Sequence, residues 1–371
     1  MARTRTDRTS ALAFDAITAK GALISSAMLA RVAQHKAAEQ TDADYGVPKG
    51  LTLRDEIARY FRIGQAIFKD LMVTETPSSA ATVNFVEKLL RVVFGFTDIH
   101  RVGTRTVGDR QFTITLEGLG GRVPVVVVPP VDDLDRLSTH LTTDGRRRSA
   151  ASALQDWLNT NEGALWGLCT NGVRLRLVRD NASLTRPAFV EADLRRIFET
   201  DAFADFAALW LLVHSSRFGI SGTPPADCML ERWRDNGQKE GITARDKLRD
   251  GVEAALLNLG NGFLSHPNNA ALREKLQTNA LPLQEFFSEL LRLVYRLIFL
   301  LAAEDRNLLH PPDTAAAPRK LYADGYSVGN LRWRGSSFRR CATRYPRCSD
   351  PKSETNAHGG PSVLALSHPP P

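Results

Sequence analysis

The sequence predicts an α+β protein that is predominantly helical, with a small mixed-sheet α/β unit flanked by helices. Apolar residues recur at helical spacing over residues 51–72 and again over 283–304. Stretches with strand patterns are confined to the middle of the chain, near 99–198. With 371 residues, the chain is long enough for two domains, or for one large domain with appendages.

The first part of the chain, 14–98, is predicted to be a helical region that follows a flexible basic N-terminus at 1–13. We expect a first helical stretch at 14–42, then the Gly/Pro connector "DYGVPKGLT", then an amphipathic helix at 51–72. Another amphipathic helix is expected at Val83–Phe94, before Gly95. The helix at 51–72 is predicted from the mostly helical spacing of Ile57, Phe61, Ile67, Phe68 and Leu71.

The α/β unit is expected at 99–198. Residues 111–117, "QFTITLE", alternate like a strand, and Val123–Val128 is a nearly continuous apolar run that is typical of a buried strand. A helix is expected at Ser149–Asn159. The stretch "LWGLCTNGVRLRLVRD" then predicts a hairpin, in which "TNG" favours a type I′ turn. The segment "PAFVEADLRRIF" predicts a short strand that leads into a helix.

Residues 199–330 are predicted to be a second helical region. In this region Leu248 to Leu259 have helical spacing, and Gly260 is placed as a C-cap. The run Leu293–Ala303 contains Arg296 and is too short to span a membrane, so a buried core helix is expected there. The tail, 331–371, is rich in Arg, Pro and Ser and is predicted to be disordered.

Charge and cysteine usage exclude several classes of protein. The formal net charge is +7, but residues 331–371 carry seven Lys/Arg and two Asp/Glu, so the rest of the chain is only slightly basic. No CxxC pair occurs among the four cysteines, and the N-terminus has no apolar segment of secretory length, so a cytoplasmic protein is expected. There is no HExxH and no P-loop motif.

The α/β unit has the outline of a PD-(D/E)xK nuclease without its chemistry. Glu117 stands where the first acid of such a site would be, and Gln155 stands where its helix glutamine would be. The next strand should supply Glu-x-Lys to hold Mg²⁺ and polarise water, but it reads "PVVVVPP". We therefore predict a degenerate nuclease-like unit with no catalytic residue and no metal site. The acids in "VDDLD" are taken as a helix start rather than as cation ligands.

Two arginine groups are candidates for contact with DNA phosphates. One is Arg146, Arg147 and Arg148 in "GRRRSA", and the other is Arg174, Arg176 and Arg179 along the second strand of the hairpin. The alternative is that these arginines form the solvated face of ordinary strands, with Leu175 and Leu177 facing the core. The sequence leaves both interpretations open.

Several long stretches resemble one protein family. "GALISSAMLARV", "DYGVPKGLTLRDEIARYFRIGQAIFKDL", "LQDWLNTNEGALWGLCTNGVRLRLVRDNASLTRPAFVEADL", "RDKLRDGVEAALLNLGNGFL" and "LVYRLIFLLAAEDRNLL" occur in this order. Together they resemble the N-terminal region of large bacterial DNA methyltransferases of the type IIG restriction-modification kind. The similarity is greatest to the adenine-specific enzymes of DISARM-like phage-defence systems, and it covers about residues 15–332.

The resemblance implies a non-catalytic part of an adenine-specific DNA methyltransferase, which contacts double-stranded DNA or couples to other subunits of a defence system. It implies S-adenosylmethionine for the full-length family. We expect no cofactor in this chain, because neither a Gly-rich cofactor loop nor an [ND]PP[YF] tetrapeptide occurs. The amino-acid sequence after "LYADGYSVGNLRWRG" departs from the family pattern, which suggests a truncated or frameshifted gene product.

The alternative function is a helical interaction or scaffold protein with no nucleic-acid role. No membrane partner is expected under either interpretation. We also expect Phe299 or Leu300 to lie exposed, which would favour oligomers or low solubility.

Overall fold

The computed structural model describes residues 14–330 apart from 22, 182–186 and 312. The predicted flexible N-terminus and disordered tail, 1–13 and 331–371, lie outside the described residues. The chain divides into two compact units at Arg245/Asp246, within one long helix, α7 (Met229–Ser265). The predicted regions 14–98 and 99–198 therefore belong to one unit, together with the chain that follows as far as Arg245.

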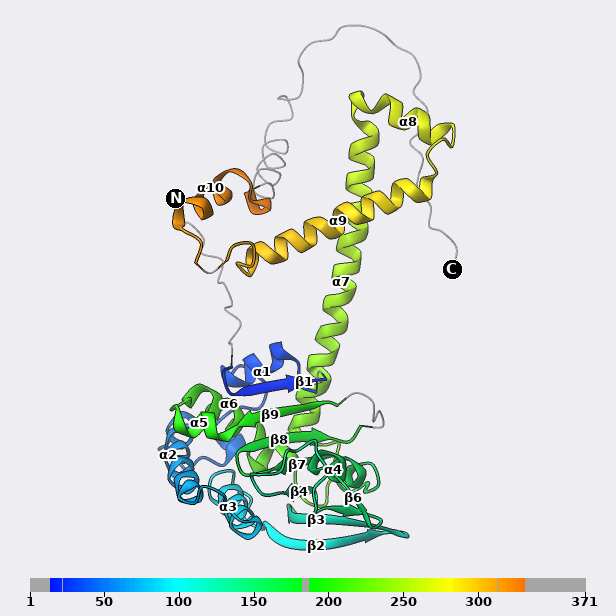
Figure 1. The fold of residues 1–371 in the computed structure, drawn as a ribbon. Coiled ribbons are helices and arrows are strands. Elements are labelled where there is room, and N and C mark those ends of the chain that lie inside the picture. The colour runs from blue at the N-terminus through cyan, green and yellow to red at the C-terminus, as the bar shows by residue number, and fades with distance from the viewer. Residues whose placement is uncertain (1–13, 22, 182–186, 312, 331–371) are drawn as a thin grey trace. The chain divides into compact units, whose positions relative to one another are not determined.

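Unit 1 is built on a mixed sheet of nine described strands (Figure 1). Their order is β1-β9-β8-β7-β4-β3-β5-β6, and β2 pairs with β3. All neighbours are antiparallel except β4 and β7, which are parallel and are joined by a crossover that contains helix α4. The bounds are β1 (Ile17–Lys20), β2 (His100–Val107), β3 (Arg110–Gly118), β4 (Val123–Val127), β5 (Thr142–Thr143), β6 (Arg146–Arg147), β7 (Trp166–Thr170), β8 (Arg174–Arg179) and β9 (Phe189–Asp193).

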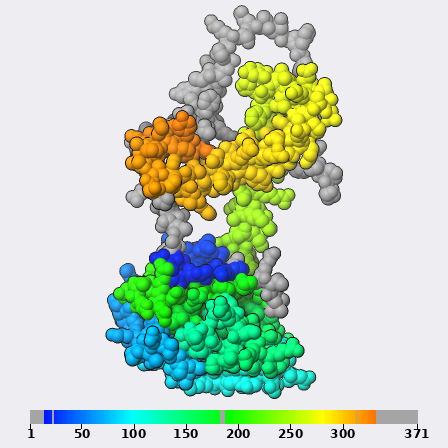
Figure 2. All heavy atoms as spheres, in the orientation of Figure 1, coloured from blue at the N-terminus to red at the C-terminus, as the bar shows by residue number. Residues whose placement is uncertain are grey.

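Helices cover both faces of this sheet. On one face lie α2 (Leu53–Met72), α3 (Ser79–Val92), α5 (Leu194–Glu199) and α6 (Phe203–Val213), and on the other lies α4 (Ala150–Leu158) (Figure 1). Helix α1 (Ser26–Ala33) and the 3₁₀ turns η1 (Ala43–Tyr45) and η2 (Ser215–Phe218) contribute to the same hydrophobic core as α2, α3, α5 and α6. In the space-filling view the strands and the light-blue helices α2 and α3 form a continuous surface (Figure 2).

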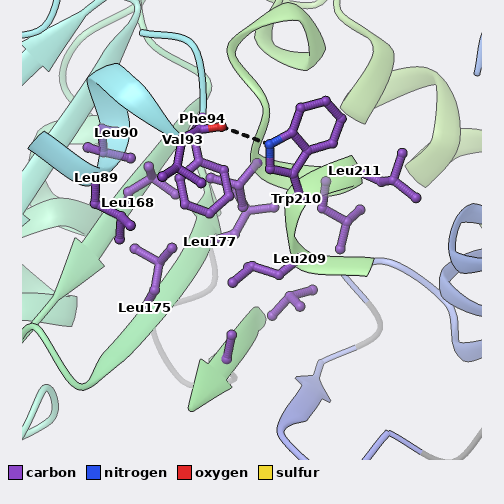
Figure 3. Close-up of a cluster of buried hydrophobic side chains, with 14 of the residues drawn as sticks. Leu89, Leu90, Val93, Phe94, Leu168, Leu175, Leu177, Leu209, Trp210 and Leu211 are labelled. Atoms are coloured by element: carbon purple, nitrogen blue, oxygen red, sulfur yellow. Dashed lines mark hydrogen bonds between the residues drawn. The ribbon is translucent and has the colours of Figure 1, made fainter. Parts of the chain in front are cut away.

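The alternation of side chains along the strands creates two cores. Leu168, Leu175 and Leu177 point to the larger core, where they lie with Leu89, Leu90, Phe94 and Trp210 of the covering helices (Figure 3). The indole Nε1 of Trp210 donates to the carbonyl of Val93 at 2.7 Å, so this buried donor is satisfied. The smaller core, under α4, is formed by Phe112, Ile114, Val126, Val128, Leu154 and Trp157, among others.

Local sequence signals set where the helices of unit 1 begin. Thr52 and Asp55 form a reciprocal capping box at the start of α2. Ser78 and Ser149 cap α3 and α4, because each hydroxyl accepts from a backbone N–H in the first turn. These caps precede the apolar periodicity that predicted the helices, so the local signals agree with one another.

The predicted α+β class is confirmed, and the strands at 111–117 and Val123–Val128 and the helices at 51–72 and Ser149–Asn159 are found nearly where expected. The helical prediction for 14–42 is wrong at its start, since residues 17–20 form β1. Strand β2 was not anticipated. Its side chains are mostly exposed and alternate only weakly, because β2 pairs with a single strand, β3, at the side of the sheet.

Three further local predictions are corrected. The hairpin exists, but its last cross-strand pair is Thr170 and Leu175, and of the four residues between them only Gly172 has a positive φ, of 83°, so the turn is not type I′. The "VDDLD" segment forms turns and no helix, and Asp135 is used in an ion pair instead. Gly260 is no C-cap, because α7 continues to Ser265; a Cβ there would lie 3.2 Å from Leu290 Cδ1.

Unit 2 comprises the C-terminal part of α7, η3 (Pro267–Asn269), α8 (Ala270–Gln277), α9 (Leu283–Asp305) and α10 (Ala316–Gly325). The carboxylate of Glu304 accepts from the Tyr322 hydroxyl at 2.5 Å and the Val328 amide at 2.6 Å, so it ties α9 to the segment after α10. The prediction of a buried core helix at Leu293–Ala303 is correct for the helix and wrong for its burial. In α9 only Leu290, Val294 and Ala303 are buried. None of the described helices is both long and apolar enough to cross a membrane.

Candidate nucleic-acid interface

The hairpin of β7 and β8 carries the candidate arginines Arg174, Arg176 and Arg179. Its loop is held by Thr170, whose hydroxyl donates to the Arg174 carbonyl at 2.6 Å, and by Asn171, whose side chain accepts from the Arg174 amide at 2.8 Å. Gly172 makes the loop possible: it has a positive φ, and a Cβ there would lie 3.0 Å from Thr82. The loop therefore presents β8 in a single defined register.

Arg176 lies in the middle of β8, and its side chain is buried rather than solvated. Its Nη1 donates to Asp135 at 2.7 Å, its Nε donates to Glu191 at 2.8 Å, and its guanidinium lies 3.9 Å from the centre of the Phe189 ring. Only 4% of the side chain is exposed, compared with 64% for Asp135 and 17% for Glu191. The interpretation that this arginine belongs to the solvated face of the strand is therefore wrong. Its side chain holds the loop before β5 against the sheet.

The electrostatics of this cluster follow from these contacts. Burial alone lowers the pKa of Arg176, but its hydrogen bonds with Asp135 and Glu191 outweigh burial and raise that pKa above its ordinary value. The hydrogen bonds from Arg176 hold the pKa of Asp135 below its usual range. Beneath the guanidinium, burial raises the pKa of the Cys169 thiol to about 12, so this cysteine is an inert core residue at neutral pH.

Arg179, at the end of β8, is directed towards the first turn of α7. It donates through Nε and Nη2 to the carboxylate of Glu231, which also accepts from Trp166 Nε1 at 3.1 Å and from Arg234 at 2.9 Å. Burial raises the pKa of Glu231, but the hydrogen bond from Arg179 and the neighbouring charges lower it overall. This network anchors the start of α7 to the hairpin.

The remaining arginines are more accessible. Arg174 is half exposed, and its nearest carboxylate oxygen, on Glu191, is 3.9 Å away. Arg148 pairs with Asp156 at 2.8 Å. Arg146 and Arg147 on β6 are exposed and form no ion pair with any described residue. These two are the candidate arginines whose charge is available to a phosphate without breaking an internal contact.

The structure does not bring the two arginine groups together. Between β8 and β6 lie four strands of the sheet, β7, β4, β3 and β5. Since Arg176 and Arg179 are engaged in ion pairs, the candidate arginines without an ion pair to a described residue are those of the β5–β6 hairpin, where Arg110 of β3 also contacts Asp144 at 3.1 Å. A duplex bound there would contact β6 and its neighbours rather than the face of β8.

The two nuclease-like positions, Glu117 and Gln155, do not form a metal site with other described residues. Glu117 is 3% exposed and accepts from Arg105 at 2.6 Å. On β4 the opposite residue is Pro124, and all five residues of that strand are buried. Gln155 on α4 donates instead to the Asn181 carbonyl at 3.5 Å. Within the described ranges, no three His, Cys, Asp or Glu side chains gather as metal binding requires.

A shallow hollow of about 250 Å³ lies at the end of α4. Its polar lining comprises Asn159, Asn161, Glu162 and Asp180, and burial raises the pKa of Asp180. Because its charged groups are carboxylates, this hollow is unsuited to a phosphate, and it is not part of the candidate interface.

The arginines could be found from the sequence, but their partners could not. Asp135, Glu191 and Glu231 lie 41, 15 and 52 residues from the arginines that they bind. Two other buried arginines were missed entirely: Arg122 donates to the Phe218 and Pro224 carbonyls, and Arg217 donates to the Glu39 carbonyl at 2.8 Å. No local pattern marks such residues, since their acceptors are backbone carbonyls far along the chain.

No family model matches this chain, and neither a curated protein nor a solved structure matches it.

Proposed function

We propose that this chain is a non-catalytic, DNA-contacting part of an adenine-specific DNA methyltransferase of a bacterial restriction-modification or phage-defence system, acting in the cytoplasm. The observation that carries the DNA contact is the exposed pair Arg146 and Arg147 on β6, whose charges no described carboxylate neutralises. The methyltransferase assignment rests on the family resemblance of residues 15–332. We assign no catalytic residue and no S-adenosylmethionine site to the chain.

In this proposal the β5–β6 hairpin holds the duplex by its phosphates and reads no base. Two arginines on a two-residue strand supply charge and position, whereas sequence reading requires side chains that reach base edges in a groove. Arg148, next to β6, adds a weaker contact because it is paired with Asp156, whereas Arg174 on β8 lies away from this hairpin and adds none. Arg176 and Arg179 keep the sheet and α7 in place and contribute to binding only by supporting the fold.

The test is a salt series of duplex-DNA affinity with the full chain. Each phosphate contact releases about one counterion, so the double variant Arg146→Ala/Arg147→Ala should reduce the slope of log K against log salt by about two. Its matched control is Arg62→Ala/Arg195→Ala, which removes the same charge from exposed arginines on α2 and α5. An equal change in both variants would show a non-specific effect of net charge and would refute the assignment to β6.

A second candidate is a helical interaction protein with no nucleic-acid role, or a part that couples subunits. The observation in its favour is the large apolar surface of α9, where Tyr295 and Phe299 are exposed by 59% and 71%. If the full chain binds no duplex even at low salt, this candidate replaces DNA contact.

A further inference from the structure

The β5–β6 hairpin holds its two exposed arginines on opposite sides of the sheet. In this hairpin Thr143 pairs with Arg146, and Thr142 pairs with Arg147. Residues that are directly opposite in an antiparallel pair point to the same side, and successive residues of one strand point to opposite sides. Arg146 therefore shares one side with Thr143, and Arg147 shares the other side with Thr142.

Arg146 points to the side of the sheet that α4 covers. Its neighbour Thr143 is 1% exposed and pairs with Phe112, which lies in the smaller core under α4. Arg148 comes two residues after Arg146, so the alternation gives it the same side, and it does reach Asp156 of α4, at 2.8 Å. Two independent contacts thus agree on the direction of Arg146.

Arg147 points to the opposite side. The hydroxyl of its neighbour Thr142 is hydrogen-bonded to the hydroxyl of Thr113 on β3, with 3.2 Å between the two oxygens. Thr113 stands between Phe112 and Ile114, whose side chains enter the core under α4, so Thr113 points away from α4. A row of phosphates along either face of the sheet would therefore meet only one of the two arginines.

The turn of the hairpin fixes this orientation. Asp144 and Gly145 have φ values of 50° and 74°, and a type I′ turn requires such positive values at both positions. The Asp144 amide donates to the Gln111 carbonyl, and the Asp144 carboxylate accepts from the Gln111 amide, each at 2.8 Å. The second carboxylate oxygen accepts from Arg110 Nε at 3.1 Å, which offsets the negative charge of the turn. Because these bonds hold the turn to β3, the hairpin cannot twist to bring both arginines to one side.

We propose that the β5–β6 hairpin enters the major groove of a duplex, with Arg146 on a phosphate of one DNA strand and Arg147 on a phosphate of the other. The proposal rests on the DNA contact proposed above and adds its geometry and its substrate class, a duplex with two charged strands. The major groove, about 12 Å wide, admits a two-stranded β-ribbon, whereas the minor groove is only about 6 Å wide, less than the roughly 10 Å thickness of a sheet. The two borders of the groove belong to opposite strands, so arginines on opposite sides of the ribbon each meet one strand.

The first experiment compares an ordinary duplex with a hybrid duplex in which one strand has neutral methylphosphonate linkages. The affinity of the full chain for each is measured over a salt series. On the ordinary duplex, Arg146→Ala and Arg147→Ala should each reduce the slope of log K against log salt by about one, and the double variant by about two. On the hybrid only one border of the groove is charged, so the natural chain uses one arginine at a time.

Either single variant should therefore keep the slope of the natural chain on the hybrid, because the chain can bind in the reversed direction and use its other arginine. Its affinity for the hybrid should fall by no more than about half, and only the double variant should lose about one in slope. Arg62→Ala, an exposed arginine on α2, is the single-charge control and should leave the slope unchanged on both duplexes. The far-ultraviolet circular dichroism of each variant should match that of the natural chain, since Arg146 and Arg147 are exposed.

The two proposals fail in different ways. If each single variant reduces the slope on the hybrid as much as on the ordinary duplex, both arginines contact the same strand; the groove geometry is then overturned and the DNA contact at β6 stands. If neither single variant changes the slope on the ordinary duplex, the DNA contact itself is refuted.

A second experiment tests the groove, with a duplex that carries bulky uncharged substituents at C5 of its pyrimidines. These groups project into the major groove and leave the phosphate charge unchanged. They should weaken binding of the natural chain and leave the affinity of the Arg146→Ala/Arg147→Ala variant unchanged. Equal affinity of the natural chain for the substituted and the ordinary duplex would overturn the placement in the major groove.

Discussion

The replacement Arg176→Met tests whether the central arginine of β8 is structural. Methionine matches the unbranched arginine side chain as far as Nε and removes the rest of the guanidinium with its charge. The replacement deletes three charge-assisted hydrogen bonds, two to Asp135 and one to Glu191, together with the contact to the Phe189 ring. Hydrogen bonds to charged groups contribute about 1.5–3 kcal/mol each, and removing one member of a buried pair costs about 3–5 kcal/mol.

The actual cost should be near the lower end of that range. Asp135 is 64% exposed, so water replaces its two lost hydrogen bonds, whereas Glu191 is 17% exposed and is left largely without compensation. We therefore expect a loss of about 3 kcal/mol in the free energy of unfolding of unit 1. The matched control is Arg174→Met on the same strand, whose 3.9 Å contact with Glu191 is half exposed; it should cost less than about 0.5 kcal/mol.

The assay is urea unfolding followed by tryptophan fluorescence. In a Trp333→Phe background, the four remaining tryptophans, Trp157, Trp166, Trp210 and Trp233, are all buried in unit 1, so the signal reports that unit even if unit 2 unfolds separately. Equal stability of the Arg176→Met and Arg174→Met proteins would refute the structural role. Unchanged stability with weaker DNA binding would show that the Arg176 guanidinium serves a phosphate instead.

Two further predictions concern pH and glycine. Burial, with Arg217 nearby, lowers the pKa of His214 to about 4, below its ordinary 6.5, so the neutral ring is the stable form in the folded state. The stability that this group contributes is complete above about pH 6.5 and declines as the pH falls towards 4, and His214→Gln should flatten this part of the urea midpoint–pH curve. Gly172→Ala should destabilise unit 1 by about 1–2 kcal/mol because of its positive φ, whereas Gly241→Ala, in open space on α7, should stabilise the helix by about 1 kcal/mol. Midpoints that move in the same direction for both glycine variants would contradict this reasoning.

Elements with a strong local pattern were predictable from the chain alone. The apolar run of β4 is buried at every position, and the capped, periodic helices α2 and α4 begin where their signals lie. The hairpin of β7 and β8 was also predictable, although its turn type was not, because Asn171 uses its side chain to bond the loop instead of adopting a positive φ.

The predictions failed where distant contacts override local preference. Residues 17–20 were expected to be helical, but they pair with residues of β9 that lie 169–175 positions away and become a strand. The apolar residues of α9 were expected in a core, yet unit 2 provides only enough packing for one side of the helix. Periodicity identifies an apolar side of a helix but does not tell whether a partner within the chain covers it.

The amino-acid sequence by itself determined the α+β class, most helices, the central strands and the positions of the arginines, because each depends on neighbours within a few residues. Only the tertiary structure decided what those arginines do. Asp135, Glu191 and Glu231 reach Arg176 and Arg179 across the fold and neutralise them, whereas Arg146 and Arg147 meet no described carboxylate. Coulombic pairing depends on distance in space, and pattern along the chain does not encode that distance.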